Sequence, residues 1–182
     1  DWSSDVCLPI FFAWCEGNGE KLLARDKDTL THAIETSARA KAAFVAADER
    51  ETLGKRALLN LGHSFAHALE AETGFSDKLL HGEAVAIGLA LAFRFSVARG
   101  RCPVEDAERV EAHLRATGLP VRPGDIILDV KGSAIAAHMA ADKKASGGDL
   151  TLILSRGIGD AFVEGGVKIG EVADFLDRLD RG

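Results

Sequence analysis

The sequence predicts a mainly α-helical domain that carries one small β-hairpin near residues 150–163. Two observations support this fold class. Apolar residues, many of them alanine, recur at intervals of three and four over most of the 182 residues, which is the period of an amphipathic helix. After Gly147-Gly148 the pattern changes to short β-prone runs separated by glycine. With 47% hydrophobic residues the chain is also too apolar to be disordered.

Two long helices are predicted in the first half of the chain. One spans 28–47, where Asp28 or Thr29 is a candidate N-cap and apolar residues follow one side. A charged stretch interrupts the pattern, and a second helix then spans 55–73. This helix is expected to end before Gly74, because glycine readily adopts the left-handed conformation that closes helices.

The second half adds helices and the hairpin. The stretch 81–100 is apolar on most of its circumference, which predicts a buried central helix, and 104–117 is amphipathic. Residues 150–154 and 161–163 flank a glycine-containing turn and are expected to pair as strands. A helix over 171–179 completes the prediction, and no internal domain boundary is visible.

Composition excludes several classes of partner. The chain has 22 Lys and Arg against 28 Asp and Glu, a net charge of −6 without a dense basic run, so no nucleic-acid partner is expected. The longest apolar run, 84–93, has ten residues, whereas a membrane span needs about 20. The first residues lack the basic region of a signal peptide. Three scattered cysteines predict reduced thiols rather than a disulfide framework, so we expect a cytoplasmic protein.

One face of the predicted helix over 55–73 carries an unusual set of polar side chains. At about 100° per residue, five polar residues fall within an arc of roughly 80°. They are Arg56, Asn60, His63, His67 and Glu70. Such a stripe can be a solvated face, but solvated faces are usually rich in Lys and Glu. Asn and His side chains coordinate and hydrogen-bond, which favours a binding site.

A third histidine follows close behind this stripe. His81 opens the next predicted helix as His-Gly-Glu, and across a short loop it can turn back toward His63 and His67. Gly82 allows close backbone approach. Histidines that converge from adjacent helices suit zinc or iron(II). A lone His81 would instead be a helix cap or a hydrogen-bonded core residue.

Cationic residues form the second candidate cluster. Lys143 and Lys144 follow Asp142, and Lys41 lies on the predicted helix 28–47. Each of these lysines is by default a solvated charge. If they face the same pocket as Arg56, together they form an anion site, because guanidinium and ammonium groups bind phosphate and carboxylate.

The runs 56–70 and 79–88 resemble the 3-dehydroquinate synthases. Other segments match this family in the same order: 11–14, 41–42, 48–51, 142–144 and 152–159. The resemblance covers about residues 10–165. It implies that 10–182 is the helical C-terminal domain of a two-domain enzyme, whose N-terminal domain binds NAD and which forms a homodimer. Residues 1–9 do not match and form an atypical N-terminal segment.

The resemblance also implies a metal centre. His63 and His81 match two histidine ligands of zinc, a site that cobalt also suits. The third family ligand, a glutamate in an Ala-Glu-Val-x-Lys stretch, has no counterpart here. Ala66 replaces a usual glycine, which is expected to tighten helix packing beside the metal.

The remaining site residues follow from the same resemblance. His67 matches a histidine that faces the substrate and relays protons, and Glu51 matches an acidic residue near the active site. Arg56, Asn60 and a lysine of the pair Lys143 and Lys144 match phosphate-binding positions, and Lys41 matches the partner of the substrate carboxylate. We expect His67, Glu51, Lys143 and Lys144 to serve catalysis.

The implied reaction converts a sugar phosphate, 3-deoxy-D-arabino-heptulosonate 7-phosphate, to 3-dehydroquinate and phosphate. This is a lyase step of the shikimate pathway, which leads to chorismate and the aromatic amino acids. The alternatives are another sugar-phosphate cyclase, a metal-dependent alcohol dehydrogenase of the same broad fold, or a non-catalytic helical fragment. Without the NAD domain and the glutamate ligand, the isolated chain is expected to be inactive.

Overall fold

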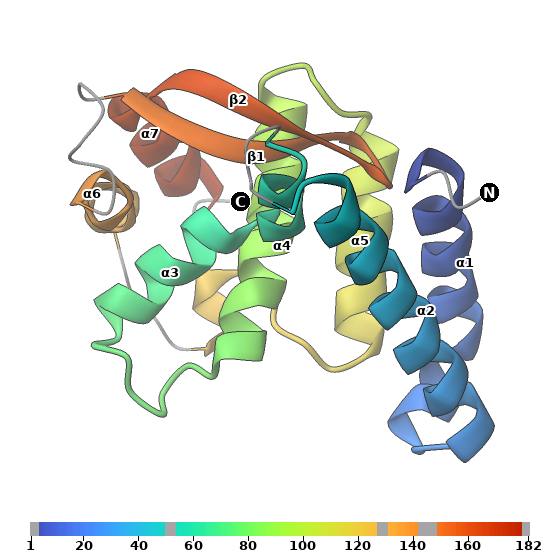
Figure 1. The fold of residues 1–182 in the computed structure, drawn as a ribbon. Coiled ribbons are helices and arrows are strands. Elements are labelled where there is room, and N and C mark those ends of the chain that lie inside the picture. The colour runs from blue at the N-terminus through green and yellow to red at the C-terminus, as the bar shows by residue number, and fades with distance from the viewer. Residues whose placement is uncertain (1–3, 50–53, 127–130, 142–148, 180–182) are drawn as a thin grey trace.

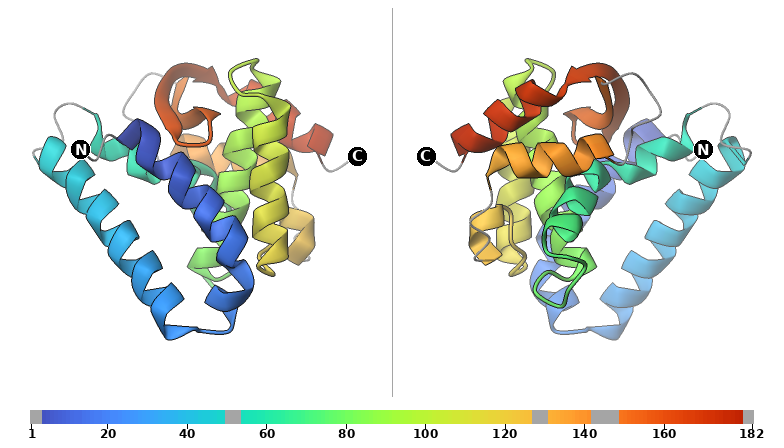
Figure 2. Two further views of the ribbon diagram at one scale, coloured as in Figure 1. Left: turned by 90° about the vertical axis from the view of Figure 1, so that its right-hand side faces the viewer. Right: turned by 90° about the vertical axis from the view of Figure 1, so that its left-hand side faces the viewer.

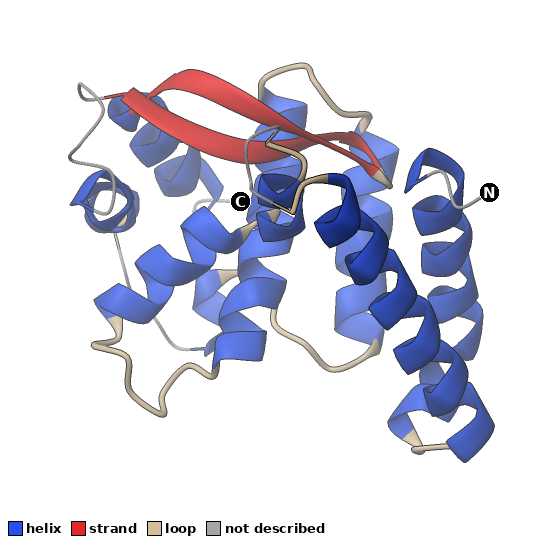
Figure 3. Ribbon diagram, in the orientation of Figure 1, coloured by secondary structure: helices blue, strands red, loops and turns tan. Residues whose placement is uncertain are grey.

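A long central helix, α4 (His81–Ala98), organises the fold. The computed structural model describes residues 4–49, 54–126, 131–141 and 149–179. Within these ranges, α4 contacts α3, α5, α7 and strand β1, and a two-stranded hairpin lies across one end of the helices (Figures 1 and 3). The other elements are α1 (Ser4–Leu23), α2 (Lys27–Ala47), η1 (Arg56–Asn60), α3 (His63–Glu72), α5 (Val104–Ala116), η2 (Pro123–Ile126), α6 (Gly132–Ala141), β1 (Asp149–Gly157), β2 (Asp160–Lys168) and α7 (Ile169–Leu179). The predicted fold class is confirmed.

The core forms around α4, as its apolar sequence predicts. One cluster joins α4 to α3, α6, α7 and the hairpin through buried side chains such as Phe65, Ile87 and Phe95, and a second joins α4 to α5. By length and composition α4 is also the one described helix that could cross a membrane, but 56% of it is buried inside the molecule. Its apolar circumference is therefore explained by packing within the domain.

The two N-terminal helices form an arm beside this core. In the left view of Figure 2, α1 and α2 make a V whose closed end points away from the hairpin. The Trp14 and His32 rings, 4.5 Å apart, join the two helices. Contacts between Phe12 and His113, with ring centroids 5.2 Å apart, attach α1 to α5. The arm is thus held to the rest of the molecule through both helices, α1 at α5 and α2 at η1.

The helices with strong periodicity are confirmed with small shifts of their ends. They are α2, α4, α5 and α7. The N-cap of α2 is Asp26 rather than Asp28 or Thr29. The Asp26 carboxylate accepts a hydrogen bond from the Thr29 backbone N–H at 2.9 Å. Thr29 therefore donates the capping bond and is not the cap itself.

Two helices, α1 and α6, were not predicted. Pro9, Gly17 and Gly19 lie inside α1, and each disfavours a helix in isolation. Packing against α2 and α5 outweighs these local preferences. The boundary predicted between 1–9 and the rest of the chain falls inside α1, which crosses it without a break. The domain division itself stays a prediction.

The prediction of one continuous helix over 55–73 is wrong. A 3₁₀-helix, η1, ends at Asn60, and α3 begins only after Gly62, which has a φ of +82°. The reason is tertiary: Gly62 lies against Gly88 of α4, and a Cβ at Gly62 would be 2.6 Å from the Gly88 carbonyl carbon. Only a glycine pair permits this approach, and the chain turns there to bring α3 onto α4.

The predicted hairpin is confirmed but is longer than residues 150–163. Its strands pair antiparallel in a register that places Ile153 opposite Val163. The turn is fixed from two sides. The Ile158 backbone N–H donates to the Asp106 carboxylate of α5 at 3.2 Å, and Gly159, with a φ of +93°, packs against Pro9 of α1. The hairpin therefore connects the arm to the core.

Ser96→Ala should lower the free energy of unfolding by about 2 kcal/mol. The Ser96 hydroxyl donates to the Ala92 carbonyl at 2.7 Å and accepts from the buried Ser155 N–H at 3.0 Å, which ties α4 to β1. Alanine would remove this bond from the buried N–H. Urea unfolding checks this, and Thr31→Val is the control, because Thr31 donates to the carbonyl four residues earlier on an exposed helix face. Equal losses in both variants would contradict the prediction.

Candidate active site

Three histidines meet where α3 and α4 begin. His63 is the first residue of α3, His67 lies one turn later, and His81 is the first residue of α4. The ring centroid of His63 is 5.8 Å from that of His67 and 6.2 Å from that of His81. The structure thus brings together the three histidines that the sequence singled out.

Backbone geometry at both ends of α3 fixes this cluster. At the start, the Gly62 carbonyl accepts the Ala66 N–H at 3.0 Å. Because Gly62 also packs against Gly88 of α4, this contact fixes the position of His63, the first residue of α3. Ala66 is fully buried at the same contact. At the other end, Gly74 and Phe75 have φ values of 65° and 54°, and this tight turn sends the chain back toward α4.

A groove of about 860 Å³ opens beside His63, between the arm and the core. It is lined by residues from α1, α2, η1, α4, α5 and the hairpin turn. Four predicted site residues line it: Lys41, Arg56, Asn60 and His63. Its walls are largely apolar, with phenylalanines at positions 11, 12, 44 and 93. Residues far apart in the sequence therefore share one concave site.

The electrostatics of the groove favour an anion. Among the described residues that line it, the positive charges are Lys41 and Arg56, and the one carboxylate, Asp160, is ion-paired with Arg156 at 3.2 Å. The Arg56 backbone N–H donates to the buried carboxylate of Asp48 at 3.3 Å. This bond joins the start of η1 to the end of α2, the helix that carries Lys41.

The two cysteines whose side chains the structure describes, Cys15 and Cys102, do not supply a nucleophile. Cys15 lines the groove, but burial, and then the charge of Glu16, raises the pKa of its thiol. Burial, and then Asp106, raises the pKa of Cys102 to about 11. Both therefore stay protonated at neutral pH, whereas the thiolate is the reactive form.

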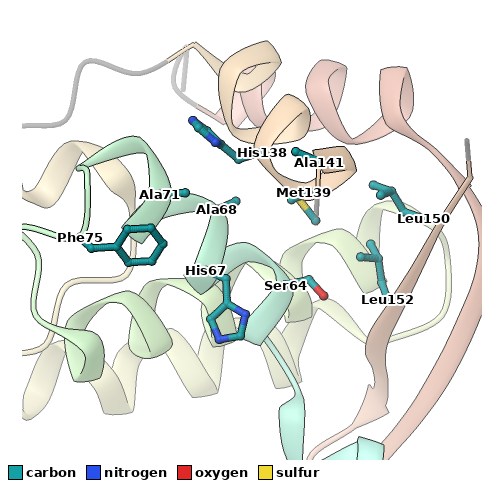
Figure 4. A pocket seen from close by; sticks show the side chains of 10 residues that line it. All are labelled: Ser64, His67, Ala68, Ala71, Phe75, His138, Met139, Ala141, Leu150 and Leu152. Carbon is teal, nitrogen blue, oxygen red and sulfur yellow. The ribbon is translucent and has the colours of Figure 1, made fainter. Parts of the chain in front are cut away.

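His67 and His81 do not line the groove, and His67 instead borders a second, smaller cavity of about 430 Å³ (Figure 4). Side chains from α3, α6 and β1 line this cavity, among them His138, Met139 and Leu152. His138 contacts Glu72 at 2.8 Å on its rim. The histidine expected to face the substrate thus lies between the groove histidine, His63, and this cavity.

Three predicted site residues, Glu51, Lys143 and Lys144, lie outside the described residues. Within the described ranges, no group of three or more His, Cys, Asp or Glu side chains is arranged to hold a metal. Glu70 lies on the polar stripe in the sequence, but no function was predicted for it. In the structure its carboxylate oxygen Oε1 lies 2.8 Å from His81 Nδ1. Its position on the same stripe as His63 and His67 was the signal in the sequence that could have indicated a role at the site.

Comparisons with known proteins identify the family of the chain. The model of the family "3-dehydroquinate synthase C-terminal" matches residues 8–145. The 3-dehydroquinate synthase of Zymomonas mobilis is 54% identical over 169 residues, which are 93% of this chain and 45% of that protein. The one from Caulobacter vibrioides is 50% identical over 167 residues, 91% of this chain and 45% of that protein. The chain thus spans about half the length of the curated relatives it matches.

Solved structures share the fold. A 2-epi-5-epi-valiolone synthase from Streptomyces hygroscopicus, solved with NAD⁺ and Zn²⁺ bound, superposes with a TM-score of 0.76 at 25% identity, over 93% of this chain and 46% of that one. A 2-deoxy-scyllo-inosose synthase, complexed with carbaglucose-6-phosphate, NAD⁺ and Co²⁺, gives a TM-score of 0.64 at 22% identity, over 84% and 41%. By its family match and its relatives at 50–54% identity, this chain belongs to the 3-dehydroquinate synthase C-terminal family.

Proposed function

We propose that this chain is the metal- and substrate-binding half of a 3-dehydroquinate synthase, a lyase that converts 3-deoxy-D-arabino-heptulosonate 7-phosphate to 3-dehydroquinate and phosphate. The observation that carries the proposal is the position of His63, which lines the groove together with Lys41 and Arg56 while its ring lies 6.2 Å from that of His81. The relatives at 50–54% identity carry this enzyme's name. The reaction, substrate and cofactors are extended to this chain on that basis.

His63 and His81 would supply two nitrogen ligands of a zinc or cobalt ion. His63 Nδ1 faces the Leu61 carbonyl at 3.4 Å, and His81 Nδ1 faces Glu70 at 2.8 Å. When both Nδ1 atoms carry the proton, both Nε2 atoms have a free lone pair, and neutral imidazole nitrogen is a preferred ligand of these metals. A bound ion would acidify a substrate hydroxyl, while NAD held by the other half of the enzyme would accept and return a hydride.

The chain's own residues would bind the two anionic ends of the substrate. We assign the carboxylate to Lys41 and the phosphate to Arg56 and Asn60, with a lysine of the pair Lys143 and Lys144. His67 would move protons beside the metal, because an imidazole ring can both accept and donate a proton. Glu51 is proposed as a further acidic group. We further propose that the full-length enzyme is a cytoplasmic homodimer and that this chain alone has no turnover.

A chimera tests the proposed function. In it, residues 10–182 of this chain replace the matching part of the Zymomonas mobilis enzyme, so that the NAD-binding half and the glutamate ligand that the resemblance implies come from that enzyme. Phosphate release from the substrate is followed with NAD⁺ and Zn²⁺. We expect turnover by the chimera and none by the isolated chain. A folded chimera that binds NAD⁺ but releases no phosphate would falsify the proposal. Turnover of a different sugar phosphate would instead assign another cyclase of the kind seen among the structural neighbours.

In the same chimera, Lys41→Met should lower kcat/KM by about tenfold to a hundredfold, because a charge-assisted hydrogen bond to the substrate is lost. Arg39→Met is the matched control on α2. Arg39 is exposed, pairs with Glu35 at 3.8 Å and does not line the groove. Steady-state kinetics should show an unchanged control. Equal effects of both substitutions would indicate damage to α2 and contradict the assignment.

A further inference from the structure

Glu70 and His81 form a contact between two helices at the histidine cluster. Glu70 Oε1 lies 2.8 Å from His81 Nδ1, across the turn that joins α3 to α4. The two side chains differ in exposure: 14% for Glu70 and 63% for His81. The well-packed partner is therefore the carboxylate, and the exposed partner is the imidazole.

The backbone around Glu70 is also held in place. The Glu70 carbonyl accepts the Phe75 N–H at 2.8 Å and the Thr73 hydroxyl at 3.0 Å. These bonds close the end of α3, so the carboxylate extends from a fixed point. His81, as the first residue of α4, has few neighbours of its own to fix its ring.

A carboxylate on Nδ1 has two effects on an exposed imidazole. It stabilises the tautomer with the proton on Nδ1, which leaves the lone pair on Nε2, and it limits rotation of the ring. Histidines that bind metals commonly donate their second N–H to such an acceptor. Glu70 Oε1 lies within hydrogen-bond distance of the His81 ring, so the Glu70 carboxylate can exert both effects on His81.

We propose that Glu70 is a positioning residue that holds His81 in the Nδ1–H tautomer, with Nε2 directed toward the metal shared with His63. This inference rests on the proposed function, because that function supplies the metal. It extends the candidate centre beyond the two histidines to a carboxylate on the same helix face as His63 and His67. His63 uses a weaker acceptor, the Leu61 carbonyl at 3.4 Å, so the dependence should be stronger at His81.

The chain contains a matched control for this contact. Glu72, two residues later on α3, makes a chemically similar contact with His138 of α6, with Oε2 2.8 Å from Nε2. That pair lies at the smaller cavity and does not touch His63 or His81. Glu72→Ala therefore removes a Glu–His contact from the same helix without altering the cluster.

The first measurement needs no metal. Long-range ¹H–¹⁵N NMR of histidine-labelled chain at mildly alkaline pH reports the tautomer of each ring. We expect His81 to be mainly the Nδ1–H form, Glu70→Ala to shift it toward Nε2–H, and Glu72→Ala to leave it unchanged. Glu70→Gln should retain part of the preference, because its amide oxygen still accepts a hydrogen bond. An unchanged His81 tautomer in Glu70→Ala would overturn the inference.

The second measurement titrates Zn²⁺ alone into the same samples and follows the His63 and His81 ring signals. Glu70→Ala should bind Zn²⁺ about tenfold to a hundredfold more weakly than the unaltered chain, and Glu72→Ala equally well. If Glu70→Ala shifts the His81 tautomer but binds Zn²⁺ as tightly as the unaltered chain, the positioning role of Glu70 is overturned, while the proposed metal site stands. Zn²⁺ that fails to perturb His63 and His81 in the unaltered chain would contradict the proposed metal site and, with it, this inference.

Discussion

Gly88→Ala is expected to lower the free energy of unfolding by about 3 kcal/mol or more. A Cβ at position 88 would lie 3.0 Å from the Ala66 backbone nitrogen, 3.2 Å from the Ala66 Cβ and closer still to the Gly62 carbonyl oxygen. Most of these are backbone atoms, which cannot rotate away as a side chain can. To admit the methyl group, α3 must therefore move off α4.

This loss opposes a local gain. In a helix interior, alanine is favoured over glycine by about 1 kcal/mol, so a net loss of the expected size can arise only from tertiary contacts. Because the Gly62 carbonyl caps the first turn of α3, the displacement should also move His63 away from His81. The NMR signals of both rings should change in the variant.

Gly82→Ala is the control, because Gly82 lies on the same helix and a Cβ there meets nothing within 4 Å. Its stability should be unchanged or slightly raised. Denaturant unfolding of both variants, with circular dichroism to confirm helical content, provides the measurement. Equal stability of the two variants would show that the α3–α4 contact admits a methyl group and would contradict the prediction.

Glu111→Ala is expected to cost about 3 kcal/mol of unfolding free energy. Glu111 on α5 is 3% exposed. Its carboxylate accepts hydrogen bonds from Arg94 Nη2 and Arg115 Nη1, each at 3.1 Å, and a further one from Arg94 Nε. Removing it leaves the half-buried Arg94 without this partner. The estimate lies at the low end for a buried pair, because Arg94 keeps some access to water.

The effect should depend on pH in a defined direction. Burial by itself raises the pKa of Glu111, but the hydrogen bond from Arg94 and the charges of Arg94, Arg115 and Arg122 outweigh it and hold the pKa below its ordinary value of 4.5. The stabilisation is therefore fully present above pH 4.5 and is lost as the pH falls through the lowered pKa. The gap between Glu111→Ala and the unaltered chain should narrow over that acidic range.

Urea unfolding at neutral and acidic pH tests both parts of this prediction. Glu108→Gln is the control, since Glu108 lies on the same helix but is exposed, and its loss should change stability by no more than about 0.5 kcal/mol. If the difference in unfolding free energy between Glu111→Ala and the unaltered chain widens as the pH falls, the prediction is contradicted.

Local sequence patterns were sufficient to predict helices that bury one face or their whole circumference. The apolar circumference of α4 and the amphipathic pattern of α5 predicted both helices to within a few residues. The pattern failed where packing opposes local preference. In α1, Pro9 and two glycines disfavour a helix, but α1 forms nevertheless and packs against α2, and its Phe12 contacts His113 of α5. At Gly62, the periodicity continues through a point at which the chain turns.

The candidate site divides in the same way. Spacing alone indicated that His63 and His67 share a face, because residues four apart lie one turn from each other. It suggested, but could not decide, that His81 returns to them. The sharing of one groove by Lys41 and Arg56 depends on how η1 and α2 meet, and the contact between Glu70 and His81 depends on the turn after α3. Glu51, Lys143 and Lys144 keep only the roles that the resemblance implies.

The sequence by itself therefore determined the helical class, the hairpin and most helix ends, and it singled out the candidate site residues. These follow from periodicity and residue type, which act over a few neighbouring positions. The tertiary structure decided where those side chains point. That outcome rests on contacts between distant segments, above all the approach of Gly62 to Gly88, whose energy no local pattern in the chain records.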